Sequence, residues 1–548
     1  MSKMARETLV DALVDLGFDT VFALMGAANQ DLICDLVERA GIRVIHGYHE
    51  GAVVSMADGY ARFSGRSGCA TVTAGPGLTN TATALAVAAH HRSPVLLLAG
   101  DIDVHQQDHP QQLDQDTFAR LLAKGSTLRT ERNLQRILGE ACGALHGSYP
   151  YVLNLPTNVQ TRAISEEPAS LPLPSHRRCP VPEPLTNAAD LLISARRPAI
   201  LAGRGAVIAG AGPVLHDLAE LLGAPLATTL PAHGLFTGSP LNAGVGGALG
   251  DGRASRVLAR CDVLLAVGTS LHPLAVPTLP EEARVIHVDT DEAVLVHGRA
   301  DCLEVHGDAA LTAQALYDCL RARVVSPREV DRTLLAALTL AGGVQPSAYL
   351  DTESTVDPRH ALAELVRVLP SHSSIVIGGG HAGLTACQIL PAATPTRWTS
   401  VSTDFAAIGQ ALPVAIGACC ADADRRVVHV TGDGELMMSF GELHTAVRYG
   451  LPLTVVVLND FGYGQERHDL NGKGRPSGYA DHPTPDFAAI ARCMGAAGYR
   501  IDSPAALDQL ESALAHQNGL VLVDVHINPA YRSSAHETVS RTMASTVT

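Results

Sequence analysis

The sequence predicts an α/β protein that contains several parallel β-sheets. Its 548 residues are too many for a single hydrophobic core. Residues 1–160 alternate between helix-like stretches and short apolar runs, which is typical of a parallel sheet with helices on both faces. The same alternation returns in two later parts of the chain. We therefore expect three α/β domains, at residues 1–165, 185–325 and 355–530.

Short apolar runs predict the strands of these domains, and helical periodicity marks the stretches between them. In the first domain we expect strands at residues 20–24, 43–45, 69–73, 94–99 and 151–155. The strands expected in the second domain are residues 199–202, 225–229, 263–267 and 285–288. Those expected in the third domain are residues 374–377, 427–430, 453–458 and 520–525.

Two stretches without periodicity separate the domains. Residues 161–184 are rich in proline, and residues 325–356 gather serine, proline and acidic residues. Both stretches are expected to be linkers.

Residues 431–464 carry the strongest functional signal. One apolar run ends at Gly432-Asp433-Gly434, and the next ends at Asn459-Asp460. Apolar residues recur between them at a spacing that predicts one continuous helix, namely at Leu436, Phe440, Leu443 and Val447.

The unit around Asp433 and Asp460 predicts a ligand site. The carboxyl ends of parallel strands meet at one edge of a sheet, where ligands bind, so the two acids are expected to lie together. A helix start favours an anion, and a hard divalent cation would bridge an anion to carboxylates. We therefore expect a divalent metal and an anionic ligand at this edge.

Glu50 is a second candidate. It lies where an expected strand gives way to a helix of mostly small and apolar residues, within residues 46–62. A carboxyl group that is partly protonated near neutral pH can exchange a proton with a ligand nitrogen. Glu50 is therefore expected to face a ligand.

These motifs resemble those of the thiamine diphosphate (ThDP)-dependent enzymes. In that family a Gly-Asp-Gly to Asn-Asn motif corresponds to residues 432–460, and a His-Glu motif followed by Ala-Asp-Gly-Tyr-Ala-Arg corresponds to residues 49–62. Residues 73–80 resemble the companion loop. The resemblance covers essentially the whole chain. The acetolactate synthase-like branch is the most similar, and benzaldehyde lyase and 2-hydroxyacyl-CoA lyase relatives are also similar.

The resemblance implies a pyrimidine-binding, a central and a diphosphate-binding domain, in that order. It implies that Mg²⁺ is held by Asp433, Asp460 and the backbone oxygen of Gly462. Glu50 would hydrogen-bond N1′ of the aminopyrimidine, and Ile408 would support the bent cofactor. Further cofactor-binding residues implied by the resemblance are Thr73, Pro76, Asn80, Gly380, His381, Gly432, Gly434, Glu435 and Tyr463.

Asp460 departs from the family pattern, which has a second asparagine at this position. An additional carboxylate facing a diphosphate adds negative charge to the site. We therefore expect the affinity for ThDP to depend on free Mg²⁺ and on pH more strongly than is usual in the family.

The resemblance also suggests residues on the substrate side. Asn29 takes the position of a catalytic histidine in benzaldehyde lyase-like members, and Gln111 or Gln112 resembles a glutamine that faces the substrate. Gln465 and His468, just beyond the metal loop, would also line the pocket. His90 and His91 follow a helix of small residues, where a histidine can relay a proton but more often has a structural role.

The family resemblance leaves several reactions open, all with a small-molecule substrate (a 2-oxo acid, an acyloin or an acyl-CoA). The first choice is decarboxylation of a 2-oxo acid followed by ligation to an acceptor, as in acetolactate synthases. The alternatives are a lyase acting on 2-hydroxy ketones or 2-hydroxyacyl-CoA, and an FAD-linked 2-oxo acid oxidase. The central domain holds FAD in some relatives. Family geometry further implies a homodimer or homotetramer.

A competing hypothesis is a nicotinamide-dependent oxidoreductase. Residues 378–383 fit the pattern G-x-G-x-x-G after an expected strand. No acidic residue follows about twenty positions later at a clear strand end, as a dinucleotide site requires. We therefore prefer the interpretation that this backbone approaches the aminopyrimidine ring.

Charge and cysteine content exclude other classes. The net charge is −15 and there are three lysines, which argues against nucleic-acid binding, anionic membranes and Schiff-base catalysis. The eleven cysteines contain no C-x-x-C pair, so a reduced, cytoplasmic setting is expected. No apolar stretch reaches membrane-spanning length.

Overall fold

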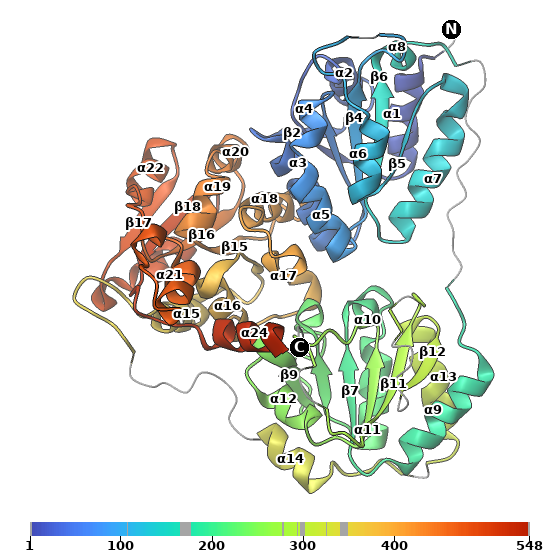
Figure 1. Cartoon of the computed structure of the whole chain (residues 1–548), viewed down its shortest axis with the longest axis vertical. Coiled ribbons are helices and arrows are strands. Elements are labelled where there is room, and N and C mark those ends of the chain that lie inside the picture. Colours follow the sequence, from blue (N-terminus) through green and yellow to red (C-terminus); the bar gives the residue numbers. More distant parts are fainter. Residues whose placement is uncertain are drawn as a thin grey trace.

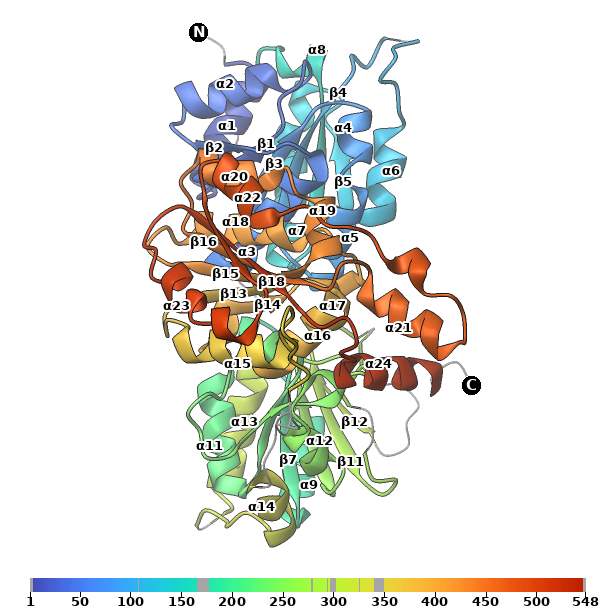
Figure 2. The ribbon, with the colours of Figure 1, turned by 90° about the vertical axis from the view of Figure 1, so that its left-hand side faces the viewer.

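The computed structural model describes residues 3–106, 108–164, 177–276, 279–292, 294–295, 302–324, 326–339 and 349–545. Their strands form three six-stranded sheets, and every strand pair in these sheets is parallel. Helices cover the sheets, so the predicted α/β class is confirmed (Figure 1). We call the sheets with their helices the first, second and third blocks. In Figure 2 the third block lies between the first, above, and the second, below.

The first block has five strands near the predicted positions and one that was not predicted. In sheet order its strands are β2 (Arg43–His46), β1 (Thr20–Ala23), β3 (Gly68–Val72), β4 (Val95–Asp101), β6 (Tyr151–Pro156) and β5 (Lys124–Thr127). Its helices are α1 (Ala5–Asp15), α2 (Gln30–Glu38), α3 (Glu50–Ser64), α4 (Pro76–Thr79), α5 (Ala82–His91), α6 (Gln115–Leu122), α7 (Leu134–His146) and α8 (Thr157–Gln160).

The second block adds two unpredicted strands, one at each edge of its sheet. In sheet order its strands are β12 (Cys302–His306), β11 (Arg284–Asp289), β10 (Val263–Val267), β7 (Pro198–Ala202), β8 (Leu226–Thr228) and β9 (Asn242–Val245). Its helices are α9 (Pro182–Ser194), α10 (Arg204–Ile208), α11 (Gly212–Leu222), α12 (Arg253–Leu258), α13 (Ala309–Arg321) and α14 (Arg332–Thr339).

The third block likewise gains one strand at each edge. In sheet order its strands are β14 (Trp398–Ser400), β13 (Ser374–Ile377), β15 (Val427–Gly432), β16 (Leu453–Asn459), β18 (Leu520–His526) and β17 (Ala497–Ile501). Its helices are α15 (Pro358–Val368), α16 (Gly380–Ile389), α17 (Ser402–Phe405), α18 (Ala411–Ala421), α19 (Asp433–Met438), α20 (Glu442–Arg448), α21 (Gly464–Gly472), α22 (Phe487–Cys493), α23 (Gln509–Leu514) and α24 (Ser534–Ser545).

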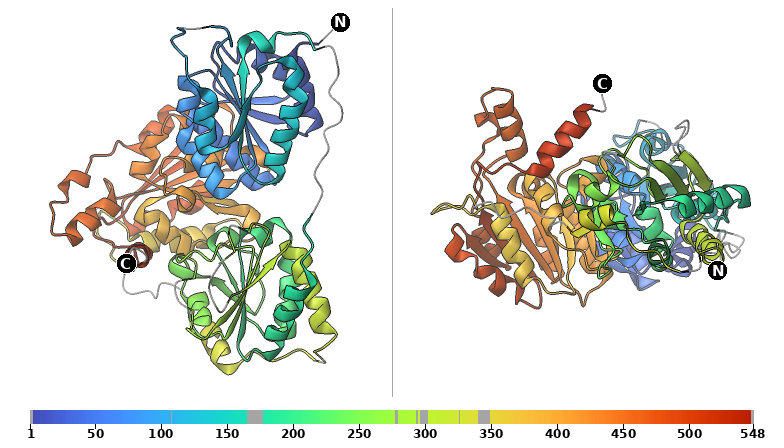
Figure 3. Two further views of the ribbon diagram at one scale, coloured as in Figure 1. Left: turned by 45° about the vertical axis from the view of Figure 1, so that its right-hand side comes forward. Right: turned by 90° about the horizontal axis from the view of Figure 1, so that it is seen from below.

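Helices α3 and α18 join the first and third blocks. Their backbones come close because glycines face the opposite helix: a Cβ at Gly59 would overlap the carbonyl oxygen of Val414, and one at Gly417 would overlap that of Met56. The two helices contribute to one shared apolar core. This core fixes where α3, which begins at Glu50, lies relative to the third sheet. In the left view of Figure 3 the blue first block lies against the orange part of the third block.

Two predictions about local structure were wrong. The single helix expected between Asp433 and Asp460 is broken at residues 439–441 into α19 and α20, although Leu436 and Leu443 are both buried as its pattern requires. The stretch expected to be a linker at 325–356 contains α14, whose Leu334 packs in the core of the second block. In the other expected linker, 161–184, residues 165–176 lie outside the described residues, and α9 begins at Pro182.

Among the described helices, none combines the length and the apolar composition that crossing a lipid bilayer requires.

Candidate functional site

Two acidic side chains meet at the carboxyl edge of the third sheet, as predicted. Asp433 begins α19 directly after β15, and Asp460 directly follows β16, the neighbouring strand. The two side chains are almost fully buried and their carboxyl groups are in hydrogen-bonding contact. Burial, and then the charge of Asp460, raise the pKa of Asp433 to about 7.

This acidic pair suits a hard divalent cation. Two buried carboxyl groups in contact repel each other unless a proton or a cation lies between them. Mg²⁺ prefers oxygen ligands, and these two side chains supply them. The backbone of Gly462 is held beside them, because its N–H donates to Oδ2 of Asp433 at 2.9 Å. The donor set therefore fits the metal that the sequence suggests.

The loop after β16 is folded tightly around Asp460. Phe461 has φ of 61°, a left-handed conformation that bulky residues rarely adopt. At Gly464 a Cβ would overlap Oδ2 of Asp460, so only glycine permits this approach. Asp460 is also paired with two side chains: Nε2 of His381 lies 3.1 Å and Nη1 of Arg467 2.9 Å from its Oδ2.

A cavity of about 1710 Å³ opens from this edge. Its floor is formed by the third block, and its walls reach α10 and the carboxyl ends of the second sheet. The predicted site residues that line it are Gly380, His381, Ile408, Gly432, Asp433, Gly434, Glu435, Asp460, Gly462, Tyr463 and Gln465. Residues that are far apart in the sequence of the third block therefore line one cavity.

The cofactor-binding residues predicted in the first block lie elsewhere, whereas His90 and His91 at the end of α5 line this cavity. Within the described part of the chain, the lining of this cavity includes neither Glu50 nor Thr73, Pro76 or Asn80. Glu50 is partly exposed at the start of α3, where Nδ2 of Asn80 donates to its Oε2 at 3.0 Å. Thr73 packs against Gly26, and Pro76 opens α4. These residues form a separate group of candidates on the first block.

Asn29 has a different environment from the one expected. Its side chain is 1% exposed. Its Oδ1 accepts the N–H of Gly26 at 2.8 Å, while its Nδ2 donates to the oxygen of Leu24 and to Oγ1 of Thr71. These bonds hold the turn between β1 and α2, so within this fold Asn29 does not face a reacting carbonyl.

The two candidate glutamines differ from each other. The backbone of Gln111 packs tightly against Gly75, in the loop of Thr73 and Pro76. Gln112 is exposed, and its Oε1 accepts the N–H of Asp108 at 3.1 Å. The buried glutamine of this region is Gln115, whose Oε1 accepts the Gly75 N–H at 2.7 Å. Gln115 therefore supports the loop that carries Thr73 and Pro76.

Glu442 was missed by the sequence analysis. It lies on α20 of the third block and is 2% exposed. Its Oε1 accepts the backbone N–H groups of Tyr48 and His49, at 2.9 and 3.1 Å. These residues directly precede Glu50, so Glu442 holds the start of α3 in place. Nothing in the local pattern distinguishes Glu442 from a solvated glutamate, because its partners lie almost four hundred residues away.

Glu435 lines the cavity but uses its carboxylate within the protein. The N–H of Gly379 donates to its Oε2 at 2.6 Å, and the N–H of Gly409 donates to its Oε1 at 3.1 Å. Oγ1 of Thr431 also donates to Oε2. Glu435 therefore joins two cavity-lining turns, one of which carries Ile408, to the end of β15.

We expect Glu435→Ala to lower the free energy of unfolding by about 2–4 kcal/mol, because two buried backbone N–H groups lose their acceptor. Thr431→Val, which removes one neutral hydrogen bond to the same carboxylate, serves as the control and should cost about 1 kcal/mol. Denaturant unfolding of the metal-free protein measures both. Equal effects of the two substitutions would contradict this role for Glu435.

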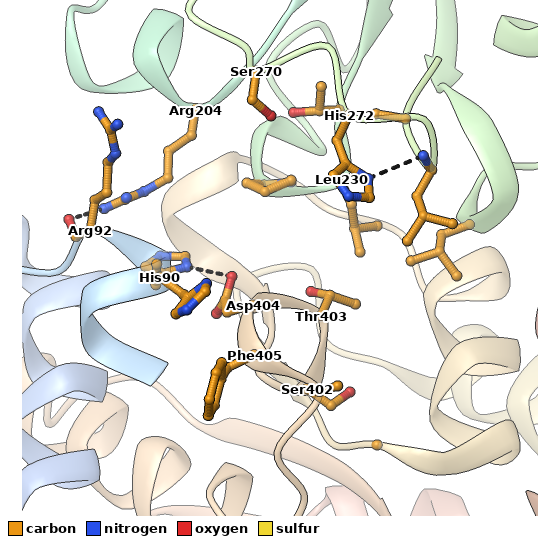
Figure 4. Close-up of a pocket in the computed structure, with 18 of the residues that line it drawn as sticks. His90, Arg92, Arg204, Leu230, Ser270, His272, Ser402, Thr403, Asp404 and Phe405 are labelled. Carbon is orange, nitrogen blue, oxygen red and sulfur yellow. Dashed lines mark hydrogen bonds and ion pairs between the residues drawn. The ribbon is translucent and has the colours of Figure 1, made fainter. Parts of the chain in front are cut away.

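A buried charge cluster joins the three blocks on another wall of the cavity. Asp404 of α17 is paired with Arg62 of α3 at 2.8 Å and with Nδ1 of His91 at 3.0 Å. Arg204 of the second block donates to the oxygen of Arg92 at 2.7 Å. Figure 4 shows Arg92, Arg204 and Asp404 converging here from the three blocks.

His91 is part of this cluster, and the exposed His90 lies beside it. The His90 ring packs on Phe405, with centroids 4.7 Å apart. Burial, and then the charges of Arg204 and Arg62, lower the pKa of His91 to about 4. The ring is therefore neutral near pH 7, where the Arg62 guanidinium keeps Asp404 ionised.

Acid should destabilise the protein through His91. The ordinary pKa of histidine is 6.5. Below pH 6.5 the His91 ring is therefore protonated in the unfolded chain but stays neutral in the folded protein. The contribution of His91 to the free energy of unfolding is complete above pH 6.5. As pH falls towards 4, this contribution decreases by about 3 kcal/mol. We expect His91→Gln to flatten the dependence of Tm on pH in this window, whereas the partly exposed control His216→Gln should not. An unchanged slope would contradict the prediction.

The glycine turn at residues 378–383 has no room beside its neighbours. A Cβ at Gly378 would overlap Oε2 of Glu435, and one at Gly379 would lie 2.5 Å from Cγ2 of Ile408. The turn therefore packs into the third block, beside the acidic pair, and lines the same cavity.

Comparison with protein-family models gives matches in all three blocks. Residues 3–119 match the model described as "Thiamine pyrophosphate enzyme, N-terminal TPP binding domain". Residues 185–316 match "Thiamine pyrophosphate enzyme, central domain". Residues 378–525 match "Thiamine pyrophosphate enzyme, C-terminal TPP binding domain".

Similar curated proteins cover most of the chain. The large subunit of acetolactate synthase isozyme 3 from Escherichia coli is 28% identical, over 95% of this chain and 94% of its own length. Acetolactate synthase from Mycobacterium avium is 27% identical, over 90% and 83%. The acetolactate synthase large subunit from Parasynechococcus marenigrum is 29% identical, over 95% and 86%.

Proposed function

Because this chain belongs to the thiamine pyrophosphate enzyme family, in its acetolactate synthase-like branch, we propose that it uses ThDP and Mg²⁺ to form or cleave a C–C bond beside a carbonyl group. Thiamine pyrophosphate and ThDP are the same compound. The observation that carries the proposal is the buried pair of Asp433 and Asp460 at the edge of a cavity. When bound, ThDP supplies a nucleophilic carbon and an electron sink for this chemistry.

The protein's own residues would bind the metal, exchange a proton with the cofactor and support its conformation. Asp433, Asp460 and the backbone oxygen of Gly462 would hold Mg²⁺. Glu50 would exchange a proton with N1′ of the aminopyrimidine, as a general acid and base. Ile408 would support the bent cofactor, and its turn is tied to Glu435 through Gly409. The roles of orientation and water exclusion thus belong to the protein.

We further propose that a second copy of the chain completes the site. The half-site around Glu50 and the cavity at Asp433 are separate within one chain, which supports this arrangement. Large apolar side chains next to the two half-sites are exposed, namely Met25, Tyr48, Met437 and Met438. Light scattering should therefore give a dimer or a dimer of dimers, and an active monomer would contradict the proposal.

Among the reactions open to this family, we propose decarboxylation of a 2-oxo acid and ligation to an acceptor. The similar proteins are named acetolactate synthases, which supports this choice. The alternative is a lyase acting on 2-hydroxy ketones or 2-hydroxyacyl-CoA. Product analysis with a panel of 2-oxo acids, acyloins and acyl-CoAs distinguishes them: release of CO₂ with a ligated product supports the first, and cleavage of an acyloin or acyl-CoA supports the second.

Calorimetry tests the cofactor directly. We expect ThDP to bind in the presence of Mg²⁺, and much more weakly once the metal is chelated. NAD should give no binding heat, which separates this proposal from a nicotinamide-dependent oxidoreductase. Binding of NAD without binding of ThDP would overturn it.

The cavity extends to the second block, where relatives with a flavin would hold FAD. Arg204, Ser270 and Asp289 line this part. A yellow purified protein would show that FAD is bound, but several carboligases hold FAD without redox use. Reduction of the bound flavin during turnover of a 2-oxo acid would favour an FAD-linked 2-oxo acid oxidase. A colourless and active protein would favour the carboligase.

A further inference from the structure

Arg467 offsets the charge by which Asp460 departs from the family pattern. Nη1 of Arg467 lies 2.9 Å from Oδ2 of Asp460, and both residues are less than one-tenth exposed. Asp433 and Asp460 bring two negative charges to this edge of the sheet, and Arg467 returns one positive charge. The net charge of these three side chains equals that of one aspartate beside a neutral amide.

Two further contacts place Arg467 in the same loop. Its Nη2 donates to the backbone oxygens of Asp460, at 3.0 Å, and Phe461, at 3.3 Å. Its Nε donates to Oδ1 of Asp481 at 2.6 Å, but the Asp481 side chain is 55% exposed, where the high dielectric constant of solvent weakens the interaction between the two charges. The charge of Arg467 therefore acts chiefly on the buried Asp460.

The charge of Asp460 has opposite effects on the binding of Mg²⁺ and of a diphosphate. A second uncompensated carboxylate attracts Mg²⁺ but repels a diphosphate, so it makes the binding of ThDP depend more steeply on the concentration of free metal. The sequence alone predicts such a steep dependence for this chain. With Arg467 in contact, the extra repulsion is cancelled.

We propose that Arg467 is a positioning residue that allows a second aspartate to replace the amide in this metal loop, by keeping the site's net charge compatible with a diphosphate. This inference rests on the proposed function. It predicts a coupling between Arg467 and Asp460 that a purely structural role would not produce.

The test measures the affinity for ThDP by calorimetry over a series of Mg²⁺ concentrations. Arg467→Met keeps the length of the side chain and removes its charge. We expect its affinity for ThDP at low Mg²⁺ to fall about tenfold or more, and to recover at high Mg²⁺. Adding Asp460→Asn to this variant should restore the affinity at low Mg²⁺ to near the wild-type value. Arg475→Met removes an exposed charge nearby and should leave the affinity unchanged.

The double variant distinguishes a role in charge balance from an independent effect of Arg467. Restoration by Asp460→Asn supports the proposal, whereas independent losses in the double variant, or an unaffected Arg467→Met, would overturn it. If Arg467→Met does not fold, Arg467→Lys retains the charge and should keep the wild-type dependence on Mg²⁺. A Lys variant whose weak binding does not respond to Mg²⁺ would overturn the proposal too. Failure of the wild-type protein to bind ThDP with Mg²⁺ would instead refute the proposed function itself.

Discussion

Glu50→Gln is expected to lower turnover by about 10²–10⁴-fold while the protein still binds ThDP and Mg²⁺. Glutamine has the shape of glutamate and retains the oxygen that accepts from Nδ2 of Asn80. It cannot exchange a proton with a ligand nitrogen. Because Glu50 lies outside the cavity of Asp433, the substitution should leave the metal-binding half of the site intact.

Steady-state kinetics and calorimetry on the same preparation separate the two effects. The matched control is Glu38→Gln, at an exposed position on α2 of the same block, which should leave both measurements unchanged. Turnover near that of the wild type in Glu50→Gln would refute the proton-exchange role. Loss of cofactor binding would show that Glu50 mainly holds the cofactor.

Asp433→Asn should weaken the Mg²⁺-dependent binding of ThDP by more than about a hundredfold, because it removes a charged ligand of the metal. The Asn Oδ1 can still accept the N–H of Gly462, so the turn is expected to keep its shape. In the metal-free protein one of two repelling buried carboxyl groups is gone, and Tm should rise.

Opposite changes in the two measurements distinguish a ligand from a structural residue. A purely structural aspartate would lower Tm when it is replaced, and the binding of ThDP would fall only in proportion to unfolding. Calorimetry with Mg²⁺ and thermal unfolding without it provide the two readings. Unaltered binding of ThDP by Asp433→Asn would show that Asp433 is not a ligand of the metal.

The sequence alone was sufficient for the central strands. Residues 263–267 are all apolar, and residues 453–458 are apolar except for Thr454, because both faces of a parallel sheet are covered. The burial of these strands can therefore be predicted from their composition. The strands that were missed are β5, β9, β12, β14 and β17, each at a sheet edge. Edge strands pair on one side only, so a less apolar sequence serves there.

The acidic pair was also predictable, because the topology follows from local alternation. Once β15 and β16 are neighbouring parallel strands, Asp433 and Asp460 must lie at the same edge. The break between α19 and α20 was not predictable from periodicity, since Leu436 and Leu443 keep one buried face across it.

Only the tertiary structure decided which polar side chains serve the site and which serve the fold. Asn29, Glu435 and Glu442 are each satisfied by backbone groups that the sequence does not mark. Arg467 follows Asp460 by seven residues, yet the contact between them depends on the loop bending back at Phe461. Strands and their ends are properties of local pattern, whereas the charge balance of a buried site depends on partners that folding alone brings within contact.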